Sequence, residues 1–101
     1  MLTSKQRAYL RKMAHDLTPI MTIGKDGLGE NSLDQVRTIF PQHELVKINL
    51  LKTCDENPKV VAHRVAAATD SEVVQVVGHR FVLYRHSRKL AEKGKAISLP
   101  Y

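Results

Sequence analysis

The sequence predicts a mixed fold of the α+β or α/β class, with two layers and a four-stranded mixed sheet. Helical and strand-like segments alternate in the order helix, strand, helix, strand, helix, strand, strand. This alternation favours parallel strand pairs joined by right-handed crossovers. The last two strand-like runs, 72–77 and 80–85, are separated only by Gly78-His79, which predicts a tight hairpin and one antiparallel strand. We expect the helices to cover one face of the sheet, and residues 1–101 to form a single domain.

The first segment has the spacing of an amphipathic helix that starts at a cap, Thr3 or Ser4, and runs to about His15. Its expected buried face consists of Gln6, Leu10, Met13, Ala14 and Leu17. The basic side chains lie elsewhere, with Lys5 and Lys12 pointing away from that face and Arg7 and Arg11 along one flank. Thr18-Pro19 ends the helix, because the residue before a proline avoids the helical region.

A short strand, 20–23, leads into the loop Gly24-Lys25-Asp26-Gly27. Beyond the loop, Asn31 or Ser32 can cap a second helix, which Pro41 ends or distorts. The apolar stripe of this helix is Leu33, Val36, Ile39 and Phe40.

Residues 44–51 alternate as a half-buried strand does, with Lys47 and Asn49 facing outward. The inward residues are Val46, Ile48 and Leu50. Asp55 or Asn57 opens a third helix, in whose first turn Pro58 is tolerated. Its expected core stripe is Val61, Val65 and Ala68. The tail from about residue 86 is basic and is expected to be mostly irregular, with Ile97 and Leu99 adding an edge contact.

The net charge of +6 is concentrated near the two ends of the chain. Residues 1–12 contain four basic residues and no acidic one, and residues 85–95 also carry a local charge of +4, whereas the remainder sums to −2. Segregated positive charge is typical of a surface that binds a polyanion. Two solvated terminal segments would produce the same pattern, so charge alone leaves both interpretations open.

The residue pattern does not indicate an enzyme. The five histidines show no metal-ligand spacing, and a single cysteine, Cys54, cannot build a structural zinc site. The glycine loop lacks the longer spacing and the Lys-Ser/Thr ending of a nucleotide-hydrolysing phosphate loop. We therefore predict no catalytic residue, no metal, no cofactor and no small-molecule substrate. One cysteine and the lack of a long apolar run predict a cytoplasmic protein without a membrane partner.

Two local features have alternative interpretations. Glycines at both ends of the loop allow positive φ angles and a close backbone approach to a nucleic acid chain, as in the GXXG loop of KH domains. The same spacing is common in ordinary strand-to-helix turns, and on its own it favours a turn. Tyr84 could stack on a base from the open face of the sheet, but a core position is favoured in a chain with few aromatic residues.

Four motifs occur in a specific order: Gly24-Lys25-Asp26-Gly27-Leu28, His43-Glu44-Leu45-Val46-Lys47, Val76-Val77-Gly78 and Val82-Leu83-Tyr84-Arg85. Together they resemble the CRM domain, the family named for chloroplast RNA splicing and ribosome maturation. The opening Lys5-Gln6-Arg7, Leu10-Arg11 and Ala14-His15 and the closing Ile97-Ser98-Leu99-Pro100 resemble its bacterial single-domain, YhbY-like members. The resemblance therefore covers nearly the whole chain.

The resemblance implies a fold similar to the C-terminal domain of bacterial translation initiation factor three, and it implies RNA binding. Bacterial members are associated with precursors of the large ribosomal subunit, so the implied partner is ribosomal RNA and the implied role is ribosome assembly. We expect a monomer. The implied RNA-binding residues are Gly24, Lys25, Asp26, Gly27, Lys5, Arg7, Arg11, Lys12, Lys47 and Arg85.

One loop residue departs from what phosphate binding needs. Asp26 brings a carboxylate to a loop where a neutral or basic residue is favoured, so it either points to solvent or accepts a hydrogen bond in an Asx turn. The alternative function is a protein-interaction module whose basic ends dock on an acidic partner of the ribosome-assembly machinery. Association that survives nuclease treatment would identify that alternative.

Overall fold

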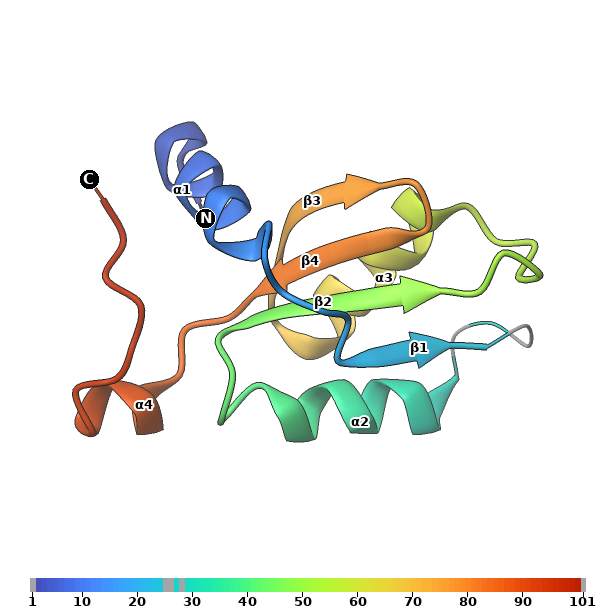
Figure 1. Cartoon of the computed structure of the whole chain (residues 1–101). Helices are drawn as coiled ribbons and strands as arrows, with labels where there is room; N and C mark the ends of the chain where they lie inside the picture. The colour runs from blue at the N-terminus through green and yellow to red at the C-terminus, as the bar shows by residue number, and fades with distance from the viewer. Residues whose placement is uncertain (1, 25–26, 28, 101) are drawn as a thin grey trace.

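The computed structural model describes residues 2–24, 27 and 29–100 of the chain, and Figure 1 shows their arrangement. The elements follow the predicted order, with one additional short helix in the tail. They are α1 (Ser4–Ala14), β1 (Met21–Ile23), α2 (Glu30–Ile39), β2 (Leu45–Leu50), α3 (Pro58–Thr69), β3 (Glu72–Val77), β4 (Arg80–Tyr84) and α4 (Arg88–Glu92).

The four strands form one mixed sheet in the order β1-β2-β4-β3. β1 and β2 pair in parallel, and β4 is antiparallel to both of its neighbours. The hairpin that closes at Gly78-His79 therefore places β4 in the gap between β2 and β3, which run in the same direction. The predicted four-stranded mixed sheet is confirmed, including its terminal hairpin.

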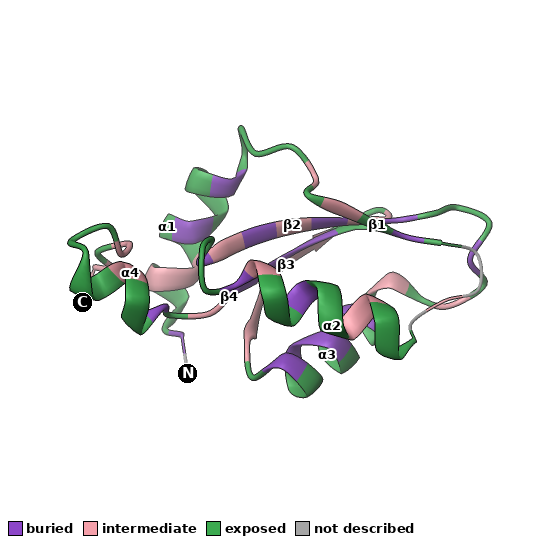
Figure 2. Cartoon of the chain, turned by 90° about the horizontal axis from the view of Figure 1, so that it is seen from below, coloured by how far each residue is buried: buried purple, intermediate pink, exposed green. Residues whose placement is uncertain are grey.

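The helices lie on both faces of the sheet, and this corrects the expectation of one covered face. Figure 2 shows α2 and α3 on one side and α1 on the other. The reason lies in β4, where Phe81, Val82, Leu83 and Tyr84 are all buried, so apolar side chains leave the strand on both sides. A sheet that is apolar on both faces needs a cover on each.

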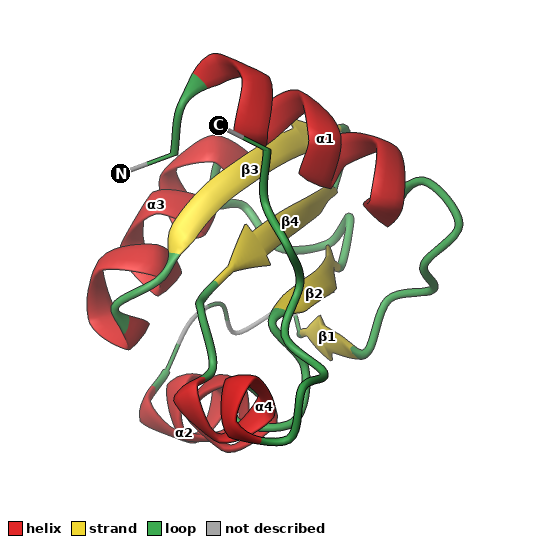
Figure 3. Ribbon diagram, turned by 90° about the vertical axis from the view of Figure 1, so that its left-hand side faces the viewer, coloured by secondary structure: helices red, strands yellow, loops and turns green. Residues whose placement is uncertain are grey.

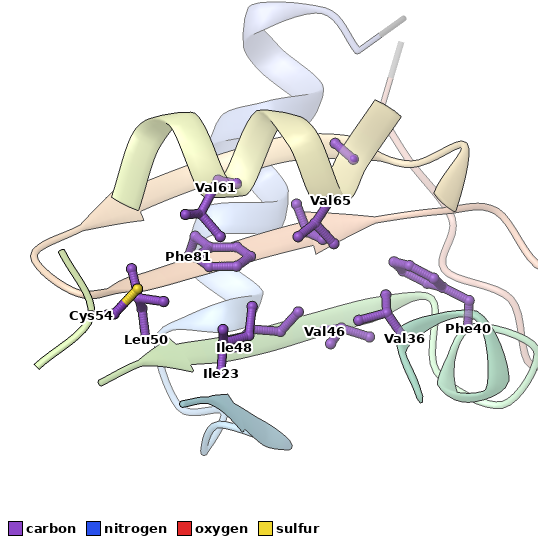
Figure 4. Close-up of a cluster of buried hydrophobic side chains, with 13 residues drawn as sticks. Ile23, Val36, Phe40, Val46, Ile48, Leu50, Cys54, Val61, Val65 and Phe81 are labelled. Carbon is purple, nitrogen blue, oxygen red and sulfur yellow. The ribbon is translucent and has the colours of Figure 1, made fainter. Parts of the chain in front are cut away.

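The larger core lies between the sheet and the α2–α3 layer (Figure 4). The predicted inward residues Val46, Ile48 and Leu50 are buried there, as are Val36 and Phe40 of the second helix. Leu33 and Ile39 are partly buried against the same cluster. The prediction of Ala68 in the α3 stripe is wrong, since Ala68 is exposed while Val61, Ala62, Val65 and Ala66 make the contact.

The smaller core lies beneath α1. Leu10 and Ala14 are fully buried there against Val74, Val82 and Tyr84. Met13 and Leu17, expected in the same stripe, remain 41% and 38% exposed. A helix that rests on a sheet beside an open surface buries a narrower stripe than its apolar spacing allows, so the prediction for these two residues is wrong.

The helix ends are set by local capping, and one predicted cap is wrong. Thr3 caps α1 in a reciprocal capping box with Gln6. Asn57 caps α3, with Pro58 in its first turn, as predicted. α2 instead begins at Glu30, and its N-cap is Gly29, two to three residues before the expected caps Asn31 or Ser32; no side chain caps it.

The tail is more ordered than expected. Ser87 caps α4 by accepting a hydrogen bond from the Leu90 N–H at 3.2 Å. Beyond α4 the chain returns toward α1 (Figure 3), where the Gln6 side-chain amide donates to the Pro100 carbonyl at 3.0 Å. Ile97 and Leu99 pack against the smaller core, which confirms the predicted edge contact.

Candidate nucleic-acid interface

Beside α1, part of the same face of the sheet is not covered by a helix. Polar and basic side chains lie on this part. Pairing brings Thr22 of β1 opposite Asn49 of β2, and Asn49 opposite Arg80 of β4. Lys47 lies two pairs further along on the same face, opposite Val82. Lys47 and Asn49 are half-buried and Arg80 is exposed. The three strands thus bring two cations and an amide to one surface.

A shallow hollow of about 200 Å³ lies between this surface and the end of α1. Its lining residues are His15, Lys47, Gln75, Val77, Arg80 and Val82. His15 is the residue that ends α1 and keeps helical backbone angles, with φ −53° and ψ −41°. We call His15, Lys47, Asn49 and Arg80 the open basic face.

The flank of α1 that leads to the open basic face is also basic. Arg7 and Arg11 precede His15 by eight and four residues, and residues four apart share one side of a helix. Between the residues that the structure describes, ion pairs involve Arg37, Arg64 and His86. Within the described part of the chain, Arg7, Arg11, Lys47 and Arg80 form no ion pair, so their charges can contact an anionic partner.

The glycine loop adjoins the same end of the sheet. Gly24 directly follows Ile23, whose partner in β2 is Leu50, so the loop begins beside the Thr22–Asn49–Arg80 row. The Gly27 N–H donates to the Gly24 carbonyl at 3.0 Å and closes a turn. Lys25 and Asp26, two of the predicted binding residues, lie outside the described residues.

The two glycines have different structural requirements. Gly27 has a φ of +80°, and a Cβ placed there would lie 2.7 Å from Oε2 of Glu56. Gly24 is exposed, and a Cβ there would meet no atom within 4 Å. The turn thus requires a glycine at position 27. At position 24 the fold would also accept a residue with a side chain.

The remaining predicted residues do not share this surface. Lys5 and Lys12 are exposed on α1, away from the buried Leu10 and Ala14. Arg85 directly follows β4, whereas Arg80 begins it, so the two arginines lie at opposite ends of that strand. At about 3.3 Å per residue, the separation along the chain is about 16 Å.

Tyr84 has the core position that its sequence context favours. It is 7% exposed, within the cluster beneath α1. Burial, and after it the negative charges of Glu44 and Glu72, raises the pKa of the Tyr84 hydroxyl above its ordinary value of 10.0. The ring is therefore not available to stack on a base.

Sequence reasoning missed Arg80 and His15 as members of this surface. Strand alternation could have placed Arg80 on the face of Val82 and Tyr84, but the partner strand was needed to bring it beside Lys47. In the described part of the chain, no group of three or more His, Cys, Asp or Glu residues could hold a metal ion. None of the helices described is both long enough and apolar enough to cross a bilayer.

A family model, curated proteins and a solved structure all match most or all of the chain. The model of the CRS1 / YhbY (CRM) domain matches residues 2–85. Probable RNA-binding protein YqeI of Bacillus subtilis is 38% identical over 100 residues, covering 99% of this chain and 100% of that protein. A Haemophilus influenzae protein named RNA-binding protein is 32% identical, covering 87% and 89% of the two chains. The solution structure of a hypothetical protein from Staphylococcus aureus superposes with a TM-score of 0.81 at 41% identity, over 99% of this chain and all of that one.

Proposed function

The chain belongs to the CRS1 / YhbY (CRM) domain family, and from that premise we propose that it binds RNA without a catalytic step of its own. The observation that carries the proposal is the joining of the glycine loop to the open basic face at one end of the sheet. The names of two relatives, which both contain the words RNA-binding protein, support the same partner class.

We assign separate tasks to the two parts of this interface. Lys47, Arg80 and Arg11 contact phosphates, which supplies affinity that does not depend on sequence. Gly24 lets the backbone of the loop approach the RNA chain, because no side chain stands between them. Lys25 adds a cation at the loop, and Lys5, Arg7 and Lys12 extend the positive field along α1.

The finer part of the proposal concerns the RNA. We propose ribosomal RNA in cytoplasmic precursors of the large subunit, with the protein acting as a monomer in ribosome assembly. Such precursors carry folded RNA with a dense phosphate surface, which suits contacts through backbone and cations. An acidic protein partner could use the same cations, so the test must separate the two.

Salt dependence of RNA binding tests the phosphate contacts. Each phosphate that a cation neutralises contributes about 0.7 to 0.9 to the slope of log affinity against log salt concentration. With a labelled fragment of large-subunit ribosomal RNA, we expect Lys47→Gln and Arg80→Gln each to reduce the magnitude of that slope by about this amount. Lys59→Gln, on the exposed surface of α3 on the other side of the sheet, is the matched control and should leave the slope unchanged.

An added side chain at Gly24 tests whether the backbone of the loop approaches the RNA. Gly24→Gln fills the space in front of the backbone, and Gly29→Gln is the control, since neither position has a positive φ or an atom within 4 Å of a Cβ. We expect weaker RNA binding only for Gly24→Gln, with both variants folded. Co-sedimentation with ribosomal particles that persists after nuclease treatment would instead identify a protein partner and contradict the proposal.

A further inference from the structure

A second hollow, of about 560 Å³, lies at the other end of the sheet, where the tail leaves β4. Four cationic or titratable side chains of the tail line it: Arg85, His86, Arg88 and Lys89. Its apolar wall comes from Phe40 and Pro41 at the end of α2. Asp70 is the one acidic residue among the described residues of its lining. We call this site the tail hollow.

The segment that carries these cations is held in place by several hydrogen bonds. The Arg85 N–H donates to the Glu44 carbonyl at 2.9 Å, and the Ser87 N–H donates to the Glu44 carboxylate at 2.7 Å. The Ser87 hydroxyl donates to the Pro41 carbonyl at 3.0 Å. The backbone on either side of His86 is thus fixed to the segment that connects α2 to β2, and this segment holds the cations in place.

The tail hollow and the open basic face have no lining residue in common. Arg80 and Arg85 are separated by the full length of β4, about 16 Å. The tail hollow also borders Phe40 and Asp70, which belong to the ends of α2 and α3, whereas the open basic face lies on the α1 side of the sheet. The two basic surfaces therefore lie at opposite ends of β4.

We propose that the tail hollow is a second phosphate-binding site for RNA, and that one chain bridges two RNA segments through its two basic surfaces. This inference rests on the proposed function, because it takes RNA as the partner of the open basic face. Arg85 and Arg88 provide planar guanidinium groups that can hold phosphate oxygens by paired hydrogen bonds. The exposed Pro41 gives the hollow an apolar side against which a sugar or base can pack.

The test counts the RNA segments bound by the full chain. The probe is a single-stranded decauridylate, labelled in one preparation with a donor dye and in another with an acceptor dye. We expect two decauridylates on each protein chain by calorimetry, and energy transfer between the dyes when both preparations are present. Binding of only one decauridylate by the unchanged chain overturns the bridging site but leaves the proposed function standing. Absence of any binding contradicts both.

Two double variants with the same change in charge locate the second site. Arg88→Glu/Lys89→Glu reverses two cations that line the hollow, and Lys93→Glu/Lys95→Glu reverses two exposed lysines of the same tail outside it. Glutamate in the first turn of α4 suits the helix dipole, so the first variant should stay folded, which a melting curve checks. We expect Arg88→Glu/Lys89→Glu to bind one decauridylate without energy transfer, and the control to bind two.

Two results would overturn the assignment of the second site. If both double variants lose the second decauridylate equally, the loss is a long-range effect of charge, and the hollow is not a binding site. The other concerns a deca-glutamate peptide, added as a competitor to Lys47→Gln/Arg80→Gln, whose open basic face is weakened. If the peptide displaces decauridylate from this variant at lower concentration than unlabelled decauridylate does, the hollow is a site for acidic protein.

Discussion

The carboxylate of Glu44 accepts a hydrogen bond from the backbone N–H of Ile97, which lies 53 positions later in the chain, at 2.6 Å. The same carboxylate accepts from the Ser87 N–H at 2.7 Å and lies 3.1 Å from Nδ1 of His86. Its side chain is only 1% exposed. Glu44, immediately before β2, thus determines the path of the tail on both sides of α4.

Removal of the Glu44 carboxylate should release the tail. Glu44→Ala leaves the Ser87 and Ile97 N–H groups without their acceptor. We expect a loss of about 3–6 kcal/mol in the free energy of unfolding, since hydrogen bonds to charged groups contribute about 1.5–3 kcal/mol each. Trypsin should also cut faster after Lys93 and Lys95. Glu92→Ala, in the exposed part of α4, is the control. Equal cleavage rates in the two variants would show that Glu44 does not hold the tail.

Alanine substitutions at three glycines should lower the free energy of unfolding by different amounts. Gly27→Ala combines a positive φ with a Cβ 2.7 Å from Oε2 of Glu56, and Gly78→Ala has a positive φ of 58° but open space. Gly24→Ala has neither problem. We expect losses of about 1–2 kcal/mol for Gly78→Ala, more for Gly27→Ala, and none for Gly24→Ala. Urea denaturation measures all three, and a larger loss at Gly24 than at Gly78 would contradict the loop geometry.

Two apolar residues of α1, three positions apart, should differ strongly in their effect on stability. Leu10 is fully buried, whereas Met13 is 41% exposed. Leu10→Ala should cost about 2–5 kcal/mol in the free energy of unfolding, and Met13→Ala should change it by less than about 0.5 kcal/mol. Similar losses in both variants would mean that α1 packs on the sheet through a wider stripe.

Alkaline pH should destabilise the fold through Tyr84. Because the folded state raises the pKa of the Tyr84 hydroxyl, the neutral phenol is favoured there, and its contribution is complete below the unfolded pKa of 10.0. That contribution is lost as the pH rises above 10.0 through the folded pKa. Tyr84→Phe should therefore lose less stability than the unchanged chain between about pH 9 and pH 11. Parallel losses in denaturation curves at both pH values would contradict this coupling.

The sequence alone was sufficient for most elements, because their signals are local. Thr3, Asn57 and Pro58 indicate where two helices begin, and Gly78-His79 indicates the hairpin. The alternation of Val46, Ile48 and Leu50 predicts the inner face of β2. The start of α2 was misplaced because Gly29 provides no side-chain cap to recognise. The tail helix α4 has only five residues, too few for a periodic pattern.

The candidate site was only partly predictable, because strand partners are not encoded in the local pattern. Lys47 and Arg85 each stand out in the sequence as basic residues of strand-like runs. Only the insertion of β4 between β2 and β3 brings Arg80 beside Asn49 and carries Arg85 to the far end of the sheet. Alternation determines which face of a strand a side chain occupies, whereas pairing between distant strands determines its neighbours. The tertiary structure therefore decided that the basic residues form two surfaces instead of one.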